Sequence, residues 1–288
     1  MAWVPPGTFR MGSGEFYPEE APVRDVSVGG FWADTHLVTV RDFRRFVKAT
    51  GYVTLAERPL DPADYPDADP ALLVPGSIVF RPTRGPVDLS SRAWWHSVPD
   101  ACWHRPDGPG SDTYTRGRHP VTQVAYEDAA AYAAWAGKVL PTEAEWERAA
   151  RGGLEEKRFA WGDAETPDGR WMTNSWQGEF PWQNTVADGH LGTSPVGAFP
   201  PNGYGLCDVT GNVWEWTCDR YADPGTPAAP CCAPPAPLPG RFPSHVIKGG
   251  SHLCAPNYCL RYRPAARQAE EIDTSTTHLG FRCVVREA

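Results

Sequence analysis

Leu140-Pro141-Thr142-Glu143-Ala144-Glu145-Trp146-Glu147 carries the clearest structural signal in this sequence. Thr142 and Glu145 have the spacing of a capping box, in which the hydroxyl and the carboxylate each accept a hydrogen bond from the other residue's backbone amide. We therefore expect a helix that starts after Thr142 and ends at Gly152-Gly153. The apolar side chains expected to face the core are Trp146, Ala149 and Ala150.

The flanking sequence predicts two more helices and a few short strands. One helix follows Thr39 as N-cap and stops at Gly51, with Val40, Phe43, Phe46 and Val47 on one face. Another runs from about Tyr126 to Trp135, with acidic residues in its first turn and Gly137 beyond its end. The predicted strands are Ser77 to Phe80, Val246 to Lys248 and Leu279 to Val285.

Composition favours one loop-rich domain spanning residues 1–288. The chain has 28 Gly and 31 Pro, together with 13 Trp that supply large rigid rings for packing. Two segments are expected to be surface excursions, Asp61 to Pro70 and the proline-rich loop 222–243. The second contains Cys231-Cys232, and adjacent cysteines seldom bond to each other or form a zinc knuckle.

Charge and hydropathy exclude several partners. A formal net charge of −8 offers no electrostatic footprint for nucleic acid. No apolar run reaches the roughly 18 residues that a membrane helix needs, and the N-terminus lacks the features of a signal peptide. We therefore expect a cytoplasmic protein, in which the eight cysteines are thiols or metal ligands rather than disulfides.

Cys254 and Cys259 lie in the segment Lys248-Gly249-Gly250-Ser251-His252-Leu253-Cys254-Ala255-Pro256-Asn257-Tyr258-Cys259. Two sulfurs among glycines, tyrosines and arginines suggest a reactive site. Their spacing alone carries little information, since a local disulfide or two buried thiols would explain it equally well.

Several blocks together make the chain resemble the formylglycine-generating enzymes, the sulfatase-modifying oxidases. The resemblance covers nearly the whole chain, and the cysteine pair is the part specific to the oxidase branch. The other blocks are Val4–Ser13, Leu140–Glu147, Asn174–Pro181, Asn202–Leu206, Gly211–Trp216 and Leu279–Cys283.

The resemblance implies a loop-rich α+β fold similar to C-type lectin-like domains. It also implies oxidation of the cysteine in an unfolded sulfatase segment, Cys-x-Pro-x-Arg, to Cα-formylglycine by molecular oxygen, with an external reductant. Cu(I) held by Cys254 and Cys259 would be the cofactor. Soft, low-coordinate Cu(I) suits two thiolates and leaves room for the substrate sulfur, whereas a closed zinc site needs four ligands.

Neighbouring residues have implied supporting roles, each with an ordinary structural alternative. Ser251 and Tyr258 are candidates to donate hydrogen bonds to oxygen or sulfur, and Trp214 to wall the pocket; loop capping and core packing explain them as well. Arg261, Arg263 and Arg267 would contact substrate or pair with carboxylates, and we expect structural pairing for at least two of them.

The resemblance also implies two structural calcium sites made of oxygen ligands, as a hard cation requires. The first consists of Asn174, the carbonyl of Ser175, Asp188 and the carbonyl of His190. The second consists of Asp208, the carbonyls of Gly211 and Val213, and Glu215. The alternative is that these groups cap turns.

The chain departs from the family pattern at a few positions. Ala133, Ala150 and Pro264 stand where secreted vertebrate members carry structural cysteines, which leaves Cys283 without a partner. His278 stands where we expect Asn near the active site; it either tunes oxygen or substrate binding or is a tolerated polar replacement.

Two other functions are compatible with this fold. A non-catalytic, calcium-stabilised peptide or glycan binder would have no reason to keep the cysteine pair. The iron-dependent sulfoxide synthases add an N-terminal helical domain and a His-rich site, whereas this chain starts at the family's first strand and has 8 His.

Overall fold

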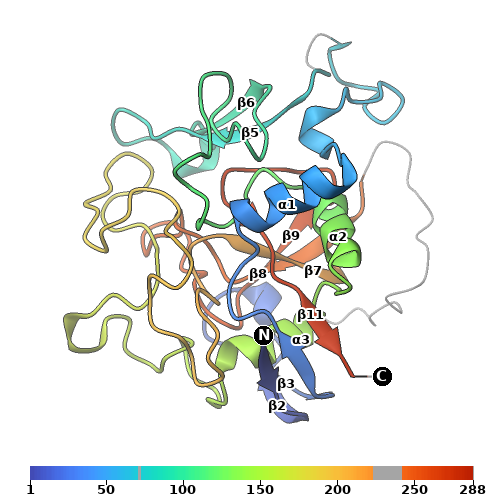
Figure 1. Ribbon diagram of the computed structural model, residues 1–288. Coiled ribbons are helices and arrows are strands. Elements are labelled where there is room, and N and C mark those ends of the chain that lie inside the picture. Colours follow the sequence, from blue (N-terminus) through green and yellow to red (C-terminus); the bar gives the residue numbers. More distant parts are fainter. Residues whose placement is uncertain (71–72, 223–241, 288) are drawn as a thin grey trace.

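The computed structural model describes residues 1–70, 73–222 and 242–287 (Figure 1). The proline-rich loop, including Cys231-Cys232, lies almost entirely outside the described residues. Within the described part, the α-helices are α1 (Val40–Thr50), α2 (Tyr126–Trp135) and α3 (Glu143–Arg151). Short 3-10 turns are η1 (Pro18–Glu20), η2 (Leu55–Glu57), η4 (Leu89–Ser91) and η5 (Pro167–Gly169).

Strands are short and form small sheets. The strands are β1 (Ala2–Val4), β2 (Gly7–Met11), β3 (Arg24–Val28), β4 (Phe31–Ala33), β5 (Gly76–Phe80), β6 (Trp95–Pro99), β7 (Trp214–Arg220), β8 (Ser244–Lys248), β9 (Arg267–Glu271), β10 (Leu279–Gly280) and β11 (Val284–Arg286). They pair as a four-stranded sheet β10-β7-β8-β9, a three-stranded sheet β1-β4-β11 and two strand pairs, β2-β3 and β5-β6. The predicted loop-rich α+β fold is confirmed.

All three predicted helices are present, with the predicted caps. The Thr142 hydroxyl accepts from the Glu145 amide at 3.1 Å, and the Glu145 carboxylate accepts from the Thr142 amide at 2.7 Å. Gly51, which ends α1, adopts the left-handed conformation with φ of 70°, a geometry that suits glycine. In the described residues, no helix combines the length and apolarity that a membrane crossing demands.

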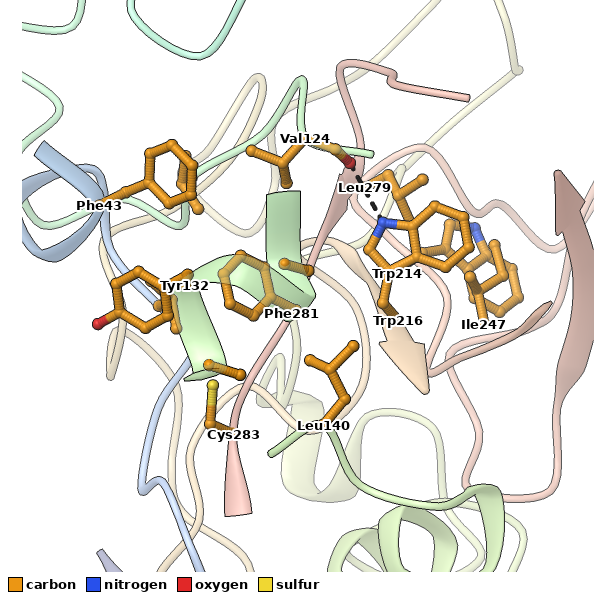
Figure 2. Close-up of a cluster of buried hydrophobic side chains, with 14 of the residues drawn as sticks. Phe43, Val124, Tyr132, Leu140, Trp214, Trp216, Ile247, Leu279, Phe281 and Cys283 are labelled. Carbon is orange, nitrogen blue, oxygen red and sulfur yellow. Dashed lines mark hydrogen bonds between the residues drawn. The ribbon is translucent and has the colours of Figure 1, made fainter. Parts of the chain in front are cut away.

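The core joins α1 and α2 to the four-stranded sheet through aromatic rings (Figure 2). Phe43 of α1 stacks on Tyr132 of α2 at 5.9 Å between ring centroids. The Trp216 indole, fully buried in β7, donates to the Val124 carbonyl at 3.2 Å. Helix α3 also packs against β7 and β8. Large rings therefore hold together a domain with little regular secondary structure.

The prediction of one strand from Leu279 to Val285 is wrong. Leu279–Gly280 pairs in parallel with β7, whereas Val284–Arg286 pairs with β4 in the other sheet. Between them, the Phe281 carbonyl accepts from the Val38 amide, and the Cys283 carbonyl accepts from the Asp34 amide, both at 2.9 Å. The buried Arg282 side chain binds Glu215 here, so the chain passes from one sheet to the next instead of continuing as a strand.

Candidate active site

The segment after β8 forms a compact turn because two glycines start it. Gly250 has φ of 68°, and a Cβ there would lie 2.7 Å from the Arg261 carbonyl carbon. Only glycine allows so close an approach. The Cys254 amide donates to the Ser251 carbonyl at 2.9 Å, and the Cys259 amide to the Ala255 carbonyl at 2.7 Å. These bonds point both cysteine side chains to the same side of the turn.

The two sulfur atoms lie 3.2 Å apart and share a hydrogen bond. Cys254 is buried, whereas Cys259 is partly exposed. Burial alone would raise the pKa of Cys254, but hydrogen bonds from the Cys259 thiol and the Ser251 amide, with the charge of Arg261, hold this pKa below its usual value. The same hydrogen bond and burial raise the pKa of Cys259 well above normal. Cys254 is therefore the more readily ionised of the two thiols, and Cys259 is the one that keeps its proton to higher pH.

Both cysteines line a cavity of about 890 Å³. The cavity also contains the three other predicted catalytic residues, which come from β7 and from the turn: Trp214, Ser251 and Tyr258. Residues that the resemblance assigns to one site thus line one hollow, which is large enough for several residues of an extended peptide.

Each supporting residue also has a structural role. The Ser251 hydroxyl accepts from the Leu253 amide at 3.2 Å, so it does cap the loop. The Tyr258 ring stacks on Phe180 at 4.4 Å with an interplanar angle of 6°, and this residue is 38% exposed. Trp214 is almost fully buried. Packing and lining the cavity are therefore compatible roles for these aromatic side chains.

The nearby arginines divide as expected. Arg263 forms a buried two-pronged pair with Glu20, at 2.9 and 2.5 Å. Arg267 pairs in the same way with Glu143. These two side chains brace the fold. Arg261 lines the cavity and binds Glu19 at 2.5 Å, so its charge lies near the thiols in a fixed position.

Sequence reasoning missed an acidic rim, formed by Glu270 and Glu271 at the end of β9, which lines the same cavity. Burial and the neighbouring Glu271 and Asp273 raise the pKa of Glu270 to about 7. Arg92 is the cation that faces it across the cavity lining. An alternating β9 pattern would have been the signal, but the stretch Arg267-Gln268-Ala269-Glu270-Glu271 is too polar to suggest a strand.

His278 also lines the cavity, beside Trp95 at 4.8 Å between rings. Its Nδ1 lies 2.6 Å from the Thr276 hydroxyl. Burial and the neighbouring His252 lower the pKa of His278 to about 3, so the ring is neutral at physiological pH. His278 therefore acts as a polar wall without charge.

The first predicted calcium set has oxygens suited to a cation. Asn174 Oδ1 and Asp188 Oδ2 are buried and have no hydrogen-bond partner in the described structure. Asn174 Nδ2 donates to the Gly192 carbonyl at 2.9 Å, which turns the orphaned oxygen away from that contact. Asp188 Oδ1 accepts from the His190 amide at 2.9 Å. Unpaired buried oxygens are costly, and a hard cation is the partner that would satisfy both.

The second predicted set differs because its side-chain oxygens already have protein partners. Both Glu215 oxygens accept from Arg282, at 2.7 and 2.8 Å, and one also accepts from the Trp146 indole at 2.9 Å. Asp208 Oδ2 accepts from the Gly197 amide at 2.7 Å. The oxygen ligands of the second set are of the type that calcium binds. The buried oxygens without a hydrogen-bond partner, however, belong to the first set.

Comparison with known proteins identifies the family. A family model described as a sulfatase-modifying factor enzyme 1-like domain matches residues 1–287. The formylglycine-generating enzyme of Mycobacterium tuberculosis is 57% identical over 289 residues, which cover 98% of this chain and 96% of that protein. The inactive C-alpha-formylglycine-generating enzyme 2 of Bos taurus is 38% identical, with 98% and 87% covered. The solved structure of PvdO from Pseudomonas aeruginosa superposes with a TM-score of 0.66 at 25% identity, covering 98% and 92%.

The chain belongs to the class of sulfatase-modifying domains, because the family model matches residues 1–287. Within that class the chain belongs to the formylglycine-generating enzymes, in which a sulfatase cysteine is oxidised to formylglycine. The predicted family and enzyme class are confirmed. The metals, the oxidant and the residue roles stay predictions.

Proposed function

We propose that this chain oxidises the cysteine of a Cys-x-Pro-x-Arg segment to Cα-formylglycine, with molecular oxygen as oxidant and Cu(I) held by Cys254 and Cys259. The single observation that carries the proposal is the pair of sulfurs 3.2 Å apart in the cavity lining. Two soft sulfurs are the donor set that Cu(I) prefers. When bound, copper would supply the one-electron chemistry by which oxygen reacts with the substrate sulfur.

The electron balance requires an external reductant. Conversion of the substrate CH2–SH to an aldehyde, with water supplying the oxygen and sulfide leaving, releases two electrons. Reduction of oxygen to water takes four electrons. A thiol or another external donor provides the difference, and none of the described residues needs to be consumed.

The chain's own groups manage protons and charge at this site. The Ser251 amide, 3.4 Å from the Cys254 sulfur, and the charge of Arg261 favour ionisation of Cys254. Cys259 is the more exposed residue of the two and keeps its proton to higher pH. Loading of the metal releases this proton, so it becomes easier as pH rises.

Substrate recognition is assigned to the cavity walls. The stacked rings of Tyr258 and Phe180 offer an apolar face for a proline. The acidic rim, Glu270 and Glu271, offers negative charge for the motif arginine. Because the cavity is open and holds only a short segment, the substrate binds as an extended chain, as an unfolded sulfatase segment would.

Calcium is proposed as a structural ion at both predicted sets, with the orphaned oxygens of Asn174 and Asp188 as the stronger support. The first set is coupled to the thiols through the backbone, since the Trp176 amide donates to the Cys254 carbonyl at 2.9 Å. The described cysteines are thiols rather than disulfides, which supports work in a reducing compartment such as the cytoplasm.

The proposal is tested with a Cys-x-Pro-x-Arg peptide, Cu(I), oxygen and a thiol reductant. Mass spectrometry should show the loss expected when the cysteine CH2–SH becomes an aldehyde. Cys254→Ala should leave the peptide unchanged, whereas Cys207→Ser, a cysteine outside the cavity lining, should keep full activity. An unmodified peptide with the native chain would instead favour the non-catalytic binder.

A further inference from the structure

A second group of metal-ligand side chains lies outside the cavity. Sγ of Cys102, a ring nitrogen of His104 and a carboxylate oxygen of Glu57 all lie within 4.8 Å of one another. None of these residues belongs to the thiol pair, the acidic rim or the predicted calcium sets. The cluster combines sulfur, nitrogen and oxygen, a mixture typical of zinc sites.

A tight turn brings Cys102 and His104 together. The Cys102 amide donates to the Arg105 carbonyl, and the Arg105 amide to the Cys102 carbonyl, both at 3.0 Å. This bridge closes the chain over Trp103 and His104, so the two ligand side chains rise from the same turn. Trp103 is buried against Phe43 at 5.4 Å, which anchors the turn to the core.

Glu57 arrives from a different part of the chain and is already oriented. It is the last residue of η2, and its Oε2 accepts from the Thr54 amide at 3.1 Å and from the Thr54 hydroxyl at 2.7 Å. The other oxygen, Oε1, lies 3.6 Å from His104 Nδ1. One oxygen thus fixes the carboxylate while the other faces the cluster, as outer hydrogen bonds do for metal ligands.

The distances match the edges of a zinc tetrahedron. Bond lengths of about 2.3 Å to sulfur, 2.05 Å to nitrogen and 2.0 Å to oxygen give edges of about 3.5 Å for S···N and 3.3 Å for N···O. The separations here are 3.3 Å between Cys102 Sγ and His104 Nδ1, and 3.6 Å from that nitrogen to Glu57 Oε1. Two of the three edges are therefore within about 0.3 Å of the tetrahedral values, and the third pair, the Cys102 sulfur and a Glu57 carboxylate oxygen, lies within 4.8 Å.

Charge and protonation are compatible with a divalent ion. A thiolate, a carboxylate and a neutral imidazole neutralise Zn²⁺. Burial lowers the pKa of His104, which keeps the ring neutral, and burial raises the pKa of Cys102, so the metal must displace a proton. Arg105 Nε donates to His104 Nε2 at 3.3 Å, which favours the tautomer with its proton on Nδ1, the nitrogen that would bind the metal. Arg105 is exposed and can move away.

We infer that Glu57, Cys102 and His104 form a zinc site with water as fourth ligand, which joins η2 to the turn after β6. This inference does not depend on the proposed function, since it concerns other residues. Its expected consequence is stabilisation of the fold by Zn²⁺, because an ion that binds only the folded state raises the melting temperature.

The test uses the full-length Cys254→Ser/Cys259→Ser variant, which lacks the other sulfur pair. Titration with Co²⁺ as a spectroscopic probe for zinc should show one thiolate-to-cobalt charge-transfer site per chain, and Zn²⁺ should displace the cobalt and raise the melting temperature. Adding Cys102→Ser should abolish the charge-transfer band. Adding Glu57→Gln, which keeps an oxygen for the Thr54 cap, should weaken binding at least about 10-fold.

Arg105→Ala separates a metal site from a simple hydrogen-bonded cluster. Removal of the competing guanidinium should tighten metal binding several-fold if the ring nitrogen is a ligand. The inference is overturned if no stoichiometric Co²⁺ or Zn²⁺ binds, or if binding survives both Cys102→Ser and His104→Ala. The peptide assay with the native chain is a separate readout, so failure of one proposal does not imply failure of the other.

Discussion

The floor and the rim of the cavity are made of opposite kinds of side chain. The floor is the turn of Cys254, which is buried, and Cys259, which is partly exposed, and backbone hydrogen bonds fix this turn. The rim is Glu270 and Glu271 at the end of β9, charged and at least partly exposed. The floor carries two thiols on a turn whose backbone is fixed. The rim carries carboxylates but no nucleophilic or redox-active side chain. If reaction takes place at the floor and the substrate is recognised at the rim, substitutions should change kcat at the floor and KM at the rim.

Cys259→Ser should produce the largest effect, on kcat. A hydroxyl replaces one of two soft sulfur ligands, and removal of one member of a unit that acts together costs at least about 10³-fold. Initial rates of peptide oxidation at saturating peptide measure this. A variant that retains a tenth of the native kcat would show that the floor does not need both sulfurs.

Asp188→Asn should produce the second largest loss of activity, by loosening the turn that holds Cys254 and Cys259. Loss of the carboxylate would weaken the proposed calcium site in the segment whose Trp176 amide donates to the Cys254 carbonyl. We expect about a 10-fold loss of activity and loss of the calcium-dependent rise in melting temperature. The matched control is Asp163→Asn, an exposed carboxylate in neither calcium set. An unchanged calcium response in Asp188→Asn would contradict the assignment.

Glu270→Gln should raise KM about 3- to 10-fold for an arginine-containing peptide and leave kcat unchanged, because a partly exposed ion pair contributes about 1 kcal/mol. A peptide with glutamine in place of arginine should bind both proteins equally. A fall in kcat with constant KM would remove the distinction between rim and floor.

The pH dependence of KM follows from the same residue. The pKa of Glu270 is raised to about 7, so the carboxylate is protonated below that pH and charged above it. KM for the arginine peptide should therefore fall as pH rises through about 7, and Glu270→Gln should flatten this change. Because the pKa of Glu270 is raised from 4.5 in the folded state, this carboxylate lowers the stability of the fold progressively between about pH 4.5 and 7 and by its full amount above pH 7. Glu270→Gln should therefore raise the melting temperature most above pH 7.

His278→Asn should have the smallest effect. The neutral ring is held by Thr276 and Trp95, and its pKa of about 3 keeps it out of the working pH range. We expect kcat and KM within about 2-fold of native and no change in the pH profile, since polar replacements away from charge partners change little. A new pH dependence in this variant would show that His278 takes part in proton transfer.

Local rules made the helices predictable, whereas the cysteine pair of the cavity floor was predicted from the family resemblance. Thr39, Thr142 and their glycine stops act within one turn of helix, so the sequence contains all the information that caps need. The rim was not predictable from local sequence. Glu270 lines the same cavity as the thiols only because β9 pairs with β8, and this pairing joins distant parts of the chain. The predicted strand from Leu279 to Val285 is divided into β10 and β11 where Arg282 binds Glu215, and these two residues are far apart in the chain.

Copper-dependent turnover tests the central claim most directly. Oxidation of a Cys-x-Pro-x-Arg peptide should be followed in oxygen and reductant while the metal-free chain is titrated with Cu(I). Activity should rise linearly and saturate at one copper per chain, and Cys254→Ala and Cys259→Ser should stay inactive throughout. Activity that is independent of copper, or equal in the native chain and Cys259→Ser, would contradict this claim.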